Sequence, residues 1–397
     1  MTSVLGPRVS PGVGLHSRSL VTSKWRYFDP VLAVLAVGIS AFGSLMIWTA
    51  TRDNLLAEGS SPTFYVKKQI IFTVLGVVIM MAVATVDYRR YVNFAPVLYG
   101  GSILALLAVY VVGHKSRGAQ AWFQFGSYQL EPSEICKVTL IVGMAAFLAA
   151  FGGKLPLRGF LAVLVLFLVP FALIYKQPDL GTALVLMIVL LAMLAVGGVR
   201  PLHLGVLTLL GILGIAAVLH FGILQKYQTA RLTSFLNTPD QVSPGFLASS
   251  STNAQAEYNG ALSKMAISSG GVHGKGIGKG PLTNTGEVPE QQTDFIFSAV
   301  GEQVGLLGSA LLLALFVLMV WRIWRASVLA RDQVGMYICV GVLGIIAFQV
   351  FENTGMAMGI MPIAGIPLPF MSYGGTSLIA MYALMGLVLS VRMHRFN

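Results

Sequence analysis

The chain has 397 residues, of which 56% are hydrophobic and only 10% are charged, and its mean hydropathy is +0.78. This composition excludes a soluble globular domain, because several apolar runs are long enough to span a bilayer. The net charge of +11 is typical of a membrane protein that retains Lys and Arg at the cytoplasmic face, near anionic lipid, and no nucleic-acid-binding motif accompanies it.

The hydropathy pattern predicts an all-α integral membrane protein with ten transmembrane helices. The spans fall at about residues 30–50, 69–86, 95–113, 134–151, 157–175, 181–198, 202–221, 296–321, 335–358 and 375–392. An even number places both termini on one side. Fourteen Lys and Arg lie on that side and six lie in the short loops opposite. Both termini are therefore expected in the cytoplasm.

The segments outside the spans differ in length. Residues 1–29 lack the apolar core of a signal peptide and are predicted to be a flexible cytoplasmic tail, and 393–397 form a second short tail. Between them, 30–392 form one membrane domain. Its largest outer loop covers about 222–295 and includes a segment with helical spacing of apolar residues, Ala256–Ile267.

Span four contains an acid and a base one helical turn apart, Glu134 and Lys137. One interpretation is a structural ion pair that neutralises itself inside the membrane. The other is the wall of a cavity that binds a phosphate-bearing ligand, because Lys is well suited to phosphate. The residues alone leave both open.

The outer connection between spans five and six reads QPDLGT and contains Asp179 and Thr182. An Asp at this position can simply cap the helix that follows. A role in a ligand site is equally compatible with the sequence.

A glycine-rich stretch, 270–280, carries Lys275 and Lys279. It lacks the spacing of a P-loop and the βαβ context of a dinucleotide site. Its backbone amides are able to form an anion-binding nest beside the two lysines. The alternative is a flexible linker.

Asp294 lies where the large outer loop gives way to span eight, and Glu302 lies about 12 Å further along that helix. Acids inside a bilayer cost about 2.5–3.5 kcal/mol each at mid-depth, so they are expected to face the protein interior. Asp294 is either the N-cap of the span or a general base.

Polar residues also gather in the last two spans. Gln349, Glu352 and Asn353 share one face of span nine, which indicates either interhelical hydrogen bonding or a ligand. The loop that follows is rich in proline and is predicted to line a cavity. Four residues at the start of span ten offer helix amides and hydroxyls to an anion, namely Ser372, Tyr373, Gly374 and Ser377.

Six stretches in this order resemble the SEDS family of cell-wall polymerases, which includes RodA, FtsW and SpoVE. They are GAQAWFQFGSYQLEPSEICK (118–137), QPDLGTA (177–183), YQTARLTSFLN (227–237), SSGGVHGKGIGKG (268–280), PEQQTDFIFSAVGEQVG (289–305) and GIPLPFMSYGGTS (365–377). The GIPLPF and PEQQTDFIF motifs are most similar in sequence to the RodA branch, which implies a role in cell elongation and shape.

The resemblance implies a glycosyltransferase of the bacterial cytoplasmic membrane that polymerises lipid II, a disaccharide-pentapeptide on undecaprenyl pyrophosphate, at the outer face. It implies a monofunctional class B penicillin-binding protein as partner. The family's essential Asp falls on Asp294, and its polar cavity residues fall on Glu134, Lys137, Asp179 and the SYGG segment. No cofactor is certain, and the residues leave open whether Mg²⁺ or Mn²⁺ accompanies the pyrophosphate.

This chain departs from the family pattern at two positions. Gln303 replaces the second acid of the usual GEELG, and Ala121 stands where many relatives have Arg or Ser, so Arg117 is a candidate for steering the substrate instead. Two other functions are compatible with the pattern. They are a lipid II flippase, which needs a cavity open to both faces, and a scaffold that only recruits the transpeptidase.

Overall fold

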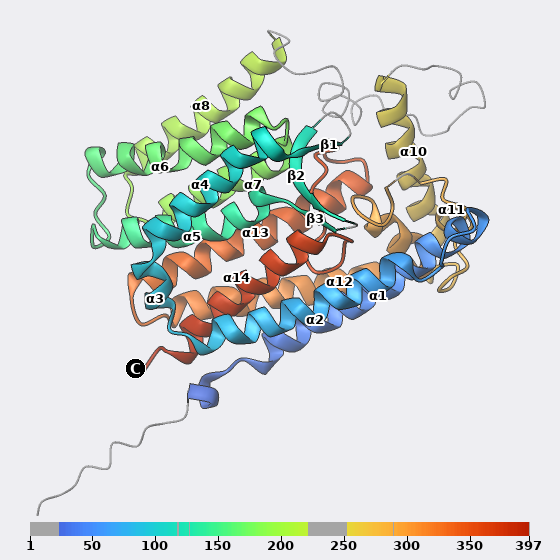
Figure 1. The fold of residues 1–397 in the computed structure, drawn as a ribbon, viewed down its shortest axis with the longest axis horizontal. Coiled ribbons are helices and arrows are strands. Elements are labelled where there is room, and N and C mark those ends of the chain that lie inside the picture. The colour runs from blue at the N-terminus through green and yellow to red at the C-terminus, as the bar shows by residue number, and fades with distance from the viewer. Residues whose placement is uncertain (1–23, 117–118, 127, 221–251, 289, 397) are drawn as a thin grey trace, which may run out of the picture.

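A computed structural model describes residues 24–116, 119–126, 128–220, 252–288 and 290–396. Arg117 and the YQTARLTSFLN stretch lie outside these ranges. The described residues form a helical bundle with one small sheet (Figure 1). The longer helices are α1 (Pro30–Ala57), α2 (Phe64–Thr85), α4 (Ala95–Val112), α5 (Pro132–Ala149), α6 (Leu157–Lys176), α7 (Leu180–Val196), α8 (Pro201–His220), α10 (Thr252–Gly270), α12 (Ile296–Val328), α13 (Gln333–Ala357) and α14 (Gly375–Met393). The shorter elements are η1 (Lys24–Tyr27), α3 (Tyr88–Asn93) and α11 (Pro281–Asn284).

Each of the ten predicted spans coincides with one of these helices. Eight of the described helices are long and apolar enough to cross a membrane, whereas α7 and the Pro201–Gly214 part of α8 are shorter apolar segments. The number of ten membrane crossings therefore stays a prediction. The helices begin where the sequence provides start signals: Pro occupies the first turn of α1, α4 and α5. Four aspartates cap helices with their side chains, namely Asp29, Asp87, Asp179 and Asp332.

The helices form an inner and an outer group. Most of α5, α13 and α14 is buried, whereas α2 and α4 leave large apolar side chains exposed. Exposed apolar surface on a membrane protein faces lipid rather than water. The predicted helix in the large loop also exists as α10, which packs on α12 and α13. The Ser263 hydroxyl is hydrogen-bonded to Ser298 of α12 (2.6 Å) and donates to the carbonyl of Ala357 of α13 (2.7 Å).

A three-stranded antiparallel sheet, which an all-helical prediction omits, lies between α4 and α5. It consists of β1 (His114–Ser116), β2 (Ala119–Phe125) and β3 (Tyr128–Leu130) in the order β1-β2-β3. Phe123 pairs with Leu130, and Gly126 enters the β2–β3 turn at φ 61°. Strands this short carry too few alternations to stand out from a loop in the sequence.

Helix α12 is broken near its outer end, because Gly305 has a non-helical backbone (φ 66°, ψ −164°). Broken helices in membranes require other partners for the freed backbone groups. Here the glycine-rich loop provides them. The amides of Lys275 and Gly276 donate to the carbonyls of Glu302 and Gln303 (2.9 and 3.0 Å), and the amide of Leu306 donates to the carbonyl of Gly271 (2.9 Å).

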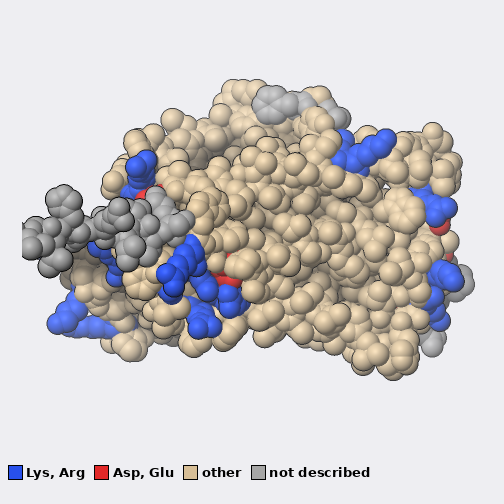
Figure 2. Space-filling view, turned by 90° about the horizontal axis from the view of Figure 1, so that it is seen from below, with Lys and Arg blue, Asp and Glu red and all other residues tan. Residues whose placement is uncertain are grey.

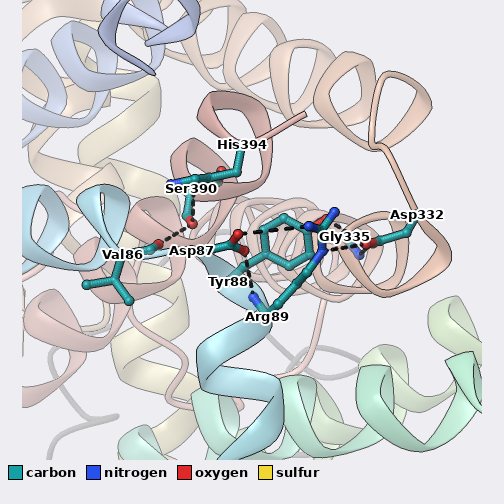
Figure 3. Close-up of polar contacts among 8 residues, drawn as sticks. All are labelled: Val86, Asp87, Tyr88, Arg89, Asp332, Gly335, Ser390 and His394. Carbon is teal, nitrogen blue, oxygen red and sulfur yellow. Dashed lines mark hydrogen bonds and ion pairs between the residues drawn. The ribbon is translucent and has the colours of Figure 1, made fainter. Parts of the chain in front are cut away.

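The end of the bundle that holds the C-terminus is closed by polar contacts (Figure 3). Asp332 accepts hydrogen bonds from the Gly335 amide (2.9 Å), the Tyr88 hydroxyl (2.8 Å) and Arg89 (3.0 Å). Nearby, the Ser390 hydroxyl donates to the carbonyl of Val86 (2.6 Å). These contacts connect α3, α13 and α14. Contacts between η1 and α14 place both ends of the described chain here, as predicted.

Candidate active site

A cavity of about 520 Å³ opens at the opposite end of the bundle from the termini. It is walled by α2, the sheet, the start of α5, the α6–α7 turn, the segment before α12 and the proline-rich segment before α14. Its polar lining residues include Glu131, Glu134, Lys137, Asp179, Thr182, Glu290, Thr293, Asp294, Gln349, Tyr373, Gly374, Thr376 and Ser377. Segments far apart in the sequence thus place eight predicted site residues around one space.

Glu134 and Lys137 form an ion pair in the cavity wall. Lys137 Nζ lies 2.7 Å from Glu134 Oε2, and the two residues are 1% and 4% exposed. They are one turn apart near the start of α5, so both project from the same face. The pair is therefore a buried ion pair and a part of the lining at once, and the two sequence interpretations are not exclusive.

Glu131 also lines the cavity, although it was not among the predicted site residues. It accepts hydrogen bonds from the Ser133 hydroxyl (2.8 Å) and the Trp122 indole (3.2 Å). Burial, reinforced by the charges of Asp179 and Glu134, raises the pKa of Glu131 to about 8. Its position three residues before Glu134 was the signal that could have identified it.

Asp179 caps α7 and is also a lining residue of the cavity. Oδ1 accepts the amide of Thr182 at 3.0 Å, whereas Oδ2 is buried without a hydrogen-bond partner among the described residues. Unsatisfied buried oxygens are costly and are usually explained by water or a ligand. The capping role predicted from the sequence is confirmed, and it uses only one of the two carboxylate oxygens.

Asp294 reaches the cavity from a segment whose backbone is fixed on three sides. The carbonyls of Gln292, Thr293 and Asp294 accept from the Tyr373 amide (2.8 Å), the Ser372 hydroxyl (2.6 Å) and Asn353 Nδ2 (2.7 Å). The predicted N-cap role is wrong, since α12 begins at Ile296 with Phe295 as N-cap. The Asp294 carboxylate is thus presented to the cavity by a braced loop.

Backbone strain occurs beside this segment. Glu290, whose carbonyl accepts the Asp294 amide at 3.1 Å, has φ 50°, and Phe370 in the proline-rich segment has φ 63°. Non-glycine residues in the left-handed region cost about 1–3 kcal/mol and tend to cluster at functional sites.

The SYGG segment is divided between the cavity and its support. Tyr373, Gly374 and Ser377 line the cavity, whereas the Ser372 hydroxyl is used within the protein, accepting the Leu368 amide (2.8 Å) and donating to Thr293. The Tyr373 ring meets Tyr65 edge-on at 5.0 Å. Burial, with smaller contributions from Tyr65 and Tyr128, raises the pKa of Tyr373 to about 12, so its hydroxyl remains a donor at neutral pH.

Three predicted residues, Lys275, Lys279 and Glu302, are not brought to the cavity. The loop amides expected to form an anion nest are already bonded to the break in α12. The Glu302 carboxylate is fully buried and accepts the amides of Leu282 (3.0 Å) and Thr283 (2.8 Å), which anchors α11. These contacts show that the glycine-rich loop and Glu302 stabilise the break in α12.

The departure at Gln303 has a structural explanation. Its Oε1 accepts the Gly278 amide at 2.9 Å, and its Nε2 donates to Thr283 Oγ1 at 3.3 Å. An amide side chain supplies both an acceptor and a donor here. Gln303 therefore stabilises the break in α12, as Glu302 does.

A second, almost entirely apolar groove of about 460 Å³ adjoins the polar cavity. It runs between α2, α4, α5 and α14, and Val83 and Leu387 mark its far end. Phe72, Tyr128 and Thr376 line both spaces, so the groove and the cavity lie next to each other. Within the described ranges no group of three or more His, Cys, Asp or Glu residues is arranged to hold a metal ion.

Comparisons with known proteins agree on one family. The model of the family described as "Cell cycle protein", FTSW_RODA_SPOVE, matches residues 30–397. The chain is 33% identical over 370 residues to the peptidoglycan glycosyltransferase MrdB of Escherichia coli K12, covering 93% of this chain and 94% of that one. It is 32% identical over 374 residues to the probable peptidoglycan glycosyltransferase FtsW of Geobacter metallireducens, covering 92% and 94%.

A solved structure shows the same fold. It is described as "Structural coordination of polymerization and crosslinking by a peptidoglycan synthase complex", and the matching chain superposes with a TM-score of 0.76 at 30% identity. The match covers 93% of this chain and 99% of that chain.

Proposed function

Because the chain belongs to the FtsW/RodA/SpoVE family and is a multi-pass peptidoglycan glycosyltransferase of the bacterial inner membrane, we propose that it polymerises lipid II at the outer face with Asp294 as the general base. The observation that carries this proposal is that Asp294, Glu134, Lys137 and Asp179 line the same polar cavity. A glycosyl transfer needs a base and a site for a departing pyrophosphate within one space.

The residues of this chain supply both requirements. The donor's bond between its anomeric carbon and the pyrophosphate oxygen breaks, and a bond from that carbon to the acceptor hydroxyl oxygen forms. The hydroxyl proton passes to the Asp294 carboxylate. One base and one leaving group require no covalent intermediate, so inversion at the anomeric carbon is expected, by analogy with glycosidases.

The leaving pyrophosphate carries negative charge that Lys137 is placed to offset. The first amides of α14, which follow Gly374, have no intrahelical partners and face the same cavity. A Mg²⁺ or Mn²⁺ ion on the pyrophosphate is a further proposal, and addition of a chelator to the polymerisation assay tests it.

The apolar groove provides a place for the polyprenyl tail of the donor. It adjoins the polar cavity at Phe72, Tyr128 and Thr376, which line both spaces. A tail in the groove would hold the pyrophosphate at the boundary between the two spaces, which is where Lys137 and the start of α14 lie.

The alternative function is a lipid II flippase, which requires polar groups open to both faces in turn. In this structure the cavity lies at one end, and the opposite end is closed by the contacts of Asp332 and by an ion pair between Asp29 and Arg322. This one-sidedness favours the polymerase.

Elongation as the cellular role, and a class B penicillin-binding protein as partner, are finer proposals. The RodA-like wording of residues 289–297 and 365–370 supports the first. The similarity to a chain of a peptidoglycan synthase complex supports the second.

The test is polymerisation of lipid II by the purified protein with its cognate transpeptidase, followed on a gel. Wild-type protein is expected to form glycan polymer, and Asp294→Asn at equal thermal stability is expected to form none. Polymer from both proteins would keep the enzyme and remove Asp294 as the base. Transbilayer movement of lipid II in liposomes without polymer would establish the flippase instead.

A further inference from the structure

Two arginines pair with one aspartate at the end of the bundle where the termini lie, and two further arginines lie close to that pair. Asp29 is fully buried and accepts from Arg322 Nε (3.0 Å) and from Arg392. Two more arginines, Arg325 and Arg395, act electrostatically on Arg392. Among the described residues neither of them has an ion pair, so this cluster carries four positive charges against one negative charge.

Another arginine at this end is paired with acids within the described ranges, unlike Arg325 and Arg395. At the same end, Arg89 is neutralised by Asp332 at 3.0 Å and by Asp87 at 4.0 Å (Figure 3). In Figure 2, Lys and Arg gather at this end around a small acidic spot, and the broad middle band of the same face is free of charge. Like charges this close repel each other, and a bound anion would relieve that repulsion.

The cluster also has an unused hydrogen-bond donor. Arg395 Nε is buried and lacks a partner among the described residues, while its guanidinium lies over the Tyr27 ring at 4.8 Å. A buried N–H without an acceptor is costly. Together with the charge excess, it points to an anionic acceptor.

Apolar and aromatic side chains adjoin the arginines on α12. Trp321, Trp324 and Val328 are 44%, 54% and 65% exposed, and their spacing of three and four residues places them on one face. Trp321 stacks under Arg325, whose guanidinium lies 5.7 Å from the ring centroid. Trp at the membrane boundary is typical of contact with lipid headgroups and the upper acyl chain.

We propose that Arg322, Arg325, Arg392 and Arg395 form a binding site for the phosphate headgroup of an anionic phospholipid in the cytoplasmic leaflet, with its acyl chain along Trp324 and Val328. The lipid, rather than free phosphate, fits because the site combines cations with an exposed apolar stripe. The cluster lies at the other end of the protein from the cavity, and the proposal is independent of the glycosyltransferase activity.

The test measures lipid retention rather than turnover. The full-length protein is reconstituted in nanodiscs of phosphatidylethanolamine with phosphatidylglycerol, extracted into mild detergent and examined by native mass spectrometry for bound lipid. Wild-type protein is expected to retain phosphatidylglycerol in preference to phosphatidylethanolamine. The double variant Arg325→Gln/Arg395→Gln, which leaves the Asp29 ion pairs intact, is expected to bind it about 30-fold more weakly.

The matched control is Arg158→Gln/Arg331→Gln, which removes two exposed arginines from the same end but outside the cluster. It is expected to retain phosphatidylglycerol like the wild type. Equal loss in both double variants would show a diffuse charge effect and overturn the site. Unchanged retention in the cluster variant, or displacement of the lipid by millimolar inorganic phosphate, would also overturn it. Thermal unfolding of each variant confirms that the fold is kept.

Discussion

The acidic side chains at the two ends of the bundle differ in how completely they are paired with arginine or lysine. At the end with the termini, Asp29, Asp87 and Asp332 each cap a helix and each pair with arginine. At the cavity end, Lys137 pairs with Glu134 and acts electrostatically on Glu131, whereas one oxygen of Asp179 has no hydrogen-bond partner among the described residues. Acids that are paired with arginine stabilise the fold, whereas acids with an unpaired carboxylate oxygen indicate where a substrate binds.

The largest effect is expected from Lys137→Met. Removing Lys137 leaves the buried carboxylate of Glu134 unpaired, so the free energy of unfolding should fall by about 3–5 kcal/mol, and polymerisation should be lost. The double variant Lys137→Met/Glu134→Met should regain most of the stability without regaining activity. Thermal unfolding and the polymer gel measure the two quantities. An active double variant would reduce the pair to a structural role.

At the other end, Asp29→Ala should separate stability from activity. Its loss leaves Arg322 and Arg392 without their shared partner, which should cost about 3 kcal/mol. The polymerisation rate per folded molecule should not change. Asp53→Ala is the control, because Asp53 forms an exposed ion pair with Arg52 and should change stability by less than about 1 kcal/mol. A rate loss in folded Asp29→Ala protein would contradict the division between the two ends.

Asp332→Ala should remove an N-cap and cost about 1 kcal/mol at neutral pH. Burial alone would raise the pKa of Asp332, but hydrogen bonds from Gly335, Tyr88 and Arg89 outweigh it and lower the pKa. A lowered folded-state pKa means that this stability is present above the unfolded-state value, near 3.9, and is lost as pH falls through the folded-state value. Melting temperatures of wild type and variant should therefore converge in acid. A constant difference would contradict the assignment.

The smallest effect concerns the shape of a pH profile. With a pKa raised to about 8, Glu131 is mostly protonated at pH 7 and ionises as the pH rises through about 8. The new negative charge beside Glu134 and Asp179 should repel the pyrophosphate, so the initial rate should decline on the alkaline side. Glu131→Gln should match the wild type at pH 7 and show no such decline. An identical alkaline decline in the variant would locate the titrating group elsewhere.

Sequence reasoning located the helices and most of the cavity, because both are marked by local signals. Asp179, Asp294, Gly374 and Ser377 lie near helix starts, and helix starts at one end of a bundle converge. Lys275 and Lys279 were assigned to the substrate because a glycine-rich loop has the same sequence pattern whether it wraps a phosphate or a broken helix. Whether the loop binds a phosphate or packs on a broken helix depends on the backbone of Gly305, which lies outside the loop.

The parts that the sequence did not reveal depend on long-range packing. Trp122 reaches Glu131 only because a short sheet folds over the start of α5. Asn353 was expected either to bond between helices or to bind a ligand, and one of its hydrogen bonds instead fixes the carbonyl of Asp294, 59 residues away. No local pattern encodes such a distance.

The most direct test of the central claim compares substrate binding with turnover in Asp294→Asn. Affinity for fluorescent lipid II, melting temperature and polymerisation are measured on one preparation of each protein. Because a general base contributes about 10²–10⁴ to the rate and acts only in the chemical step, the variant should bind and melt like the wild type and lose polymerisation by that factor. Polymerisation at the wild-type rate, or loss of binding together with activity, would contradict Asp294 as the base.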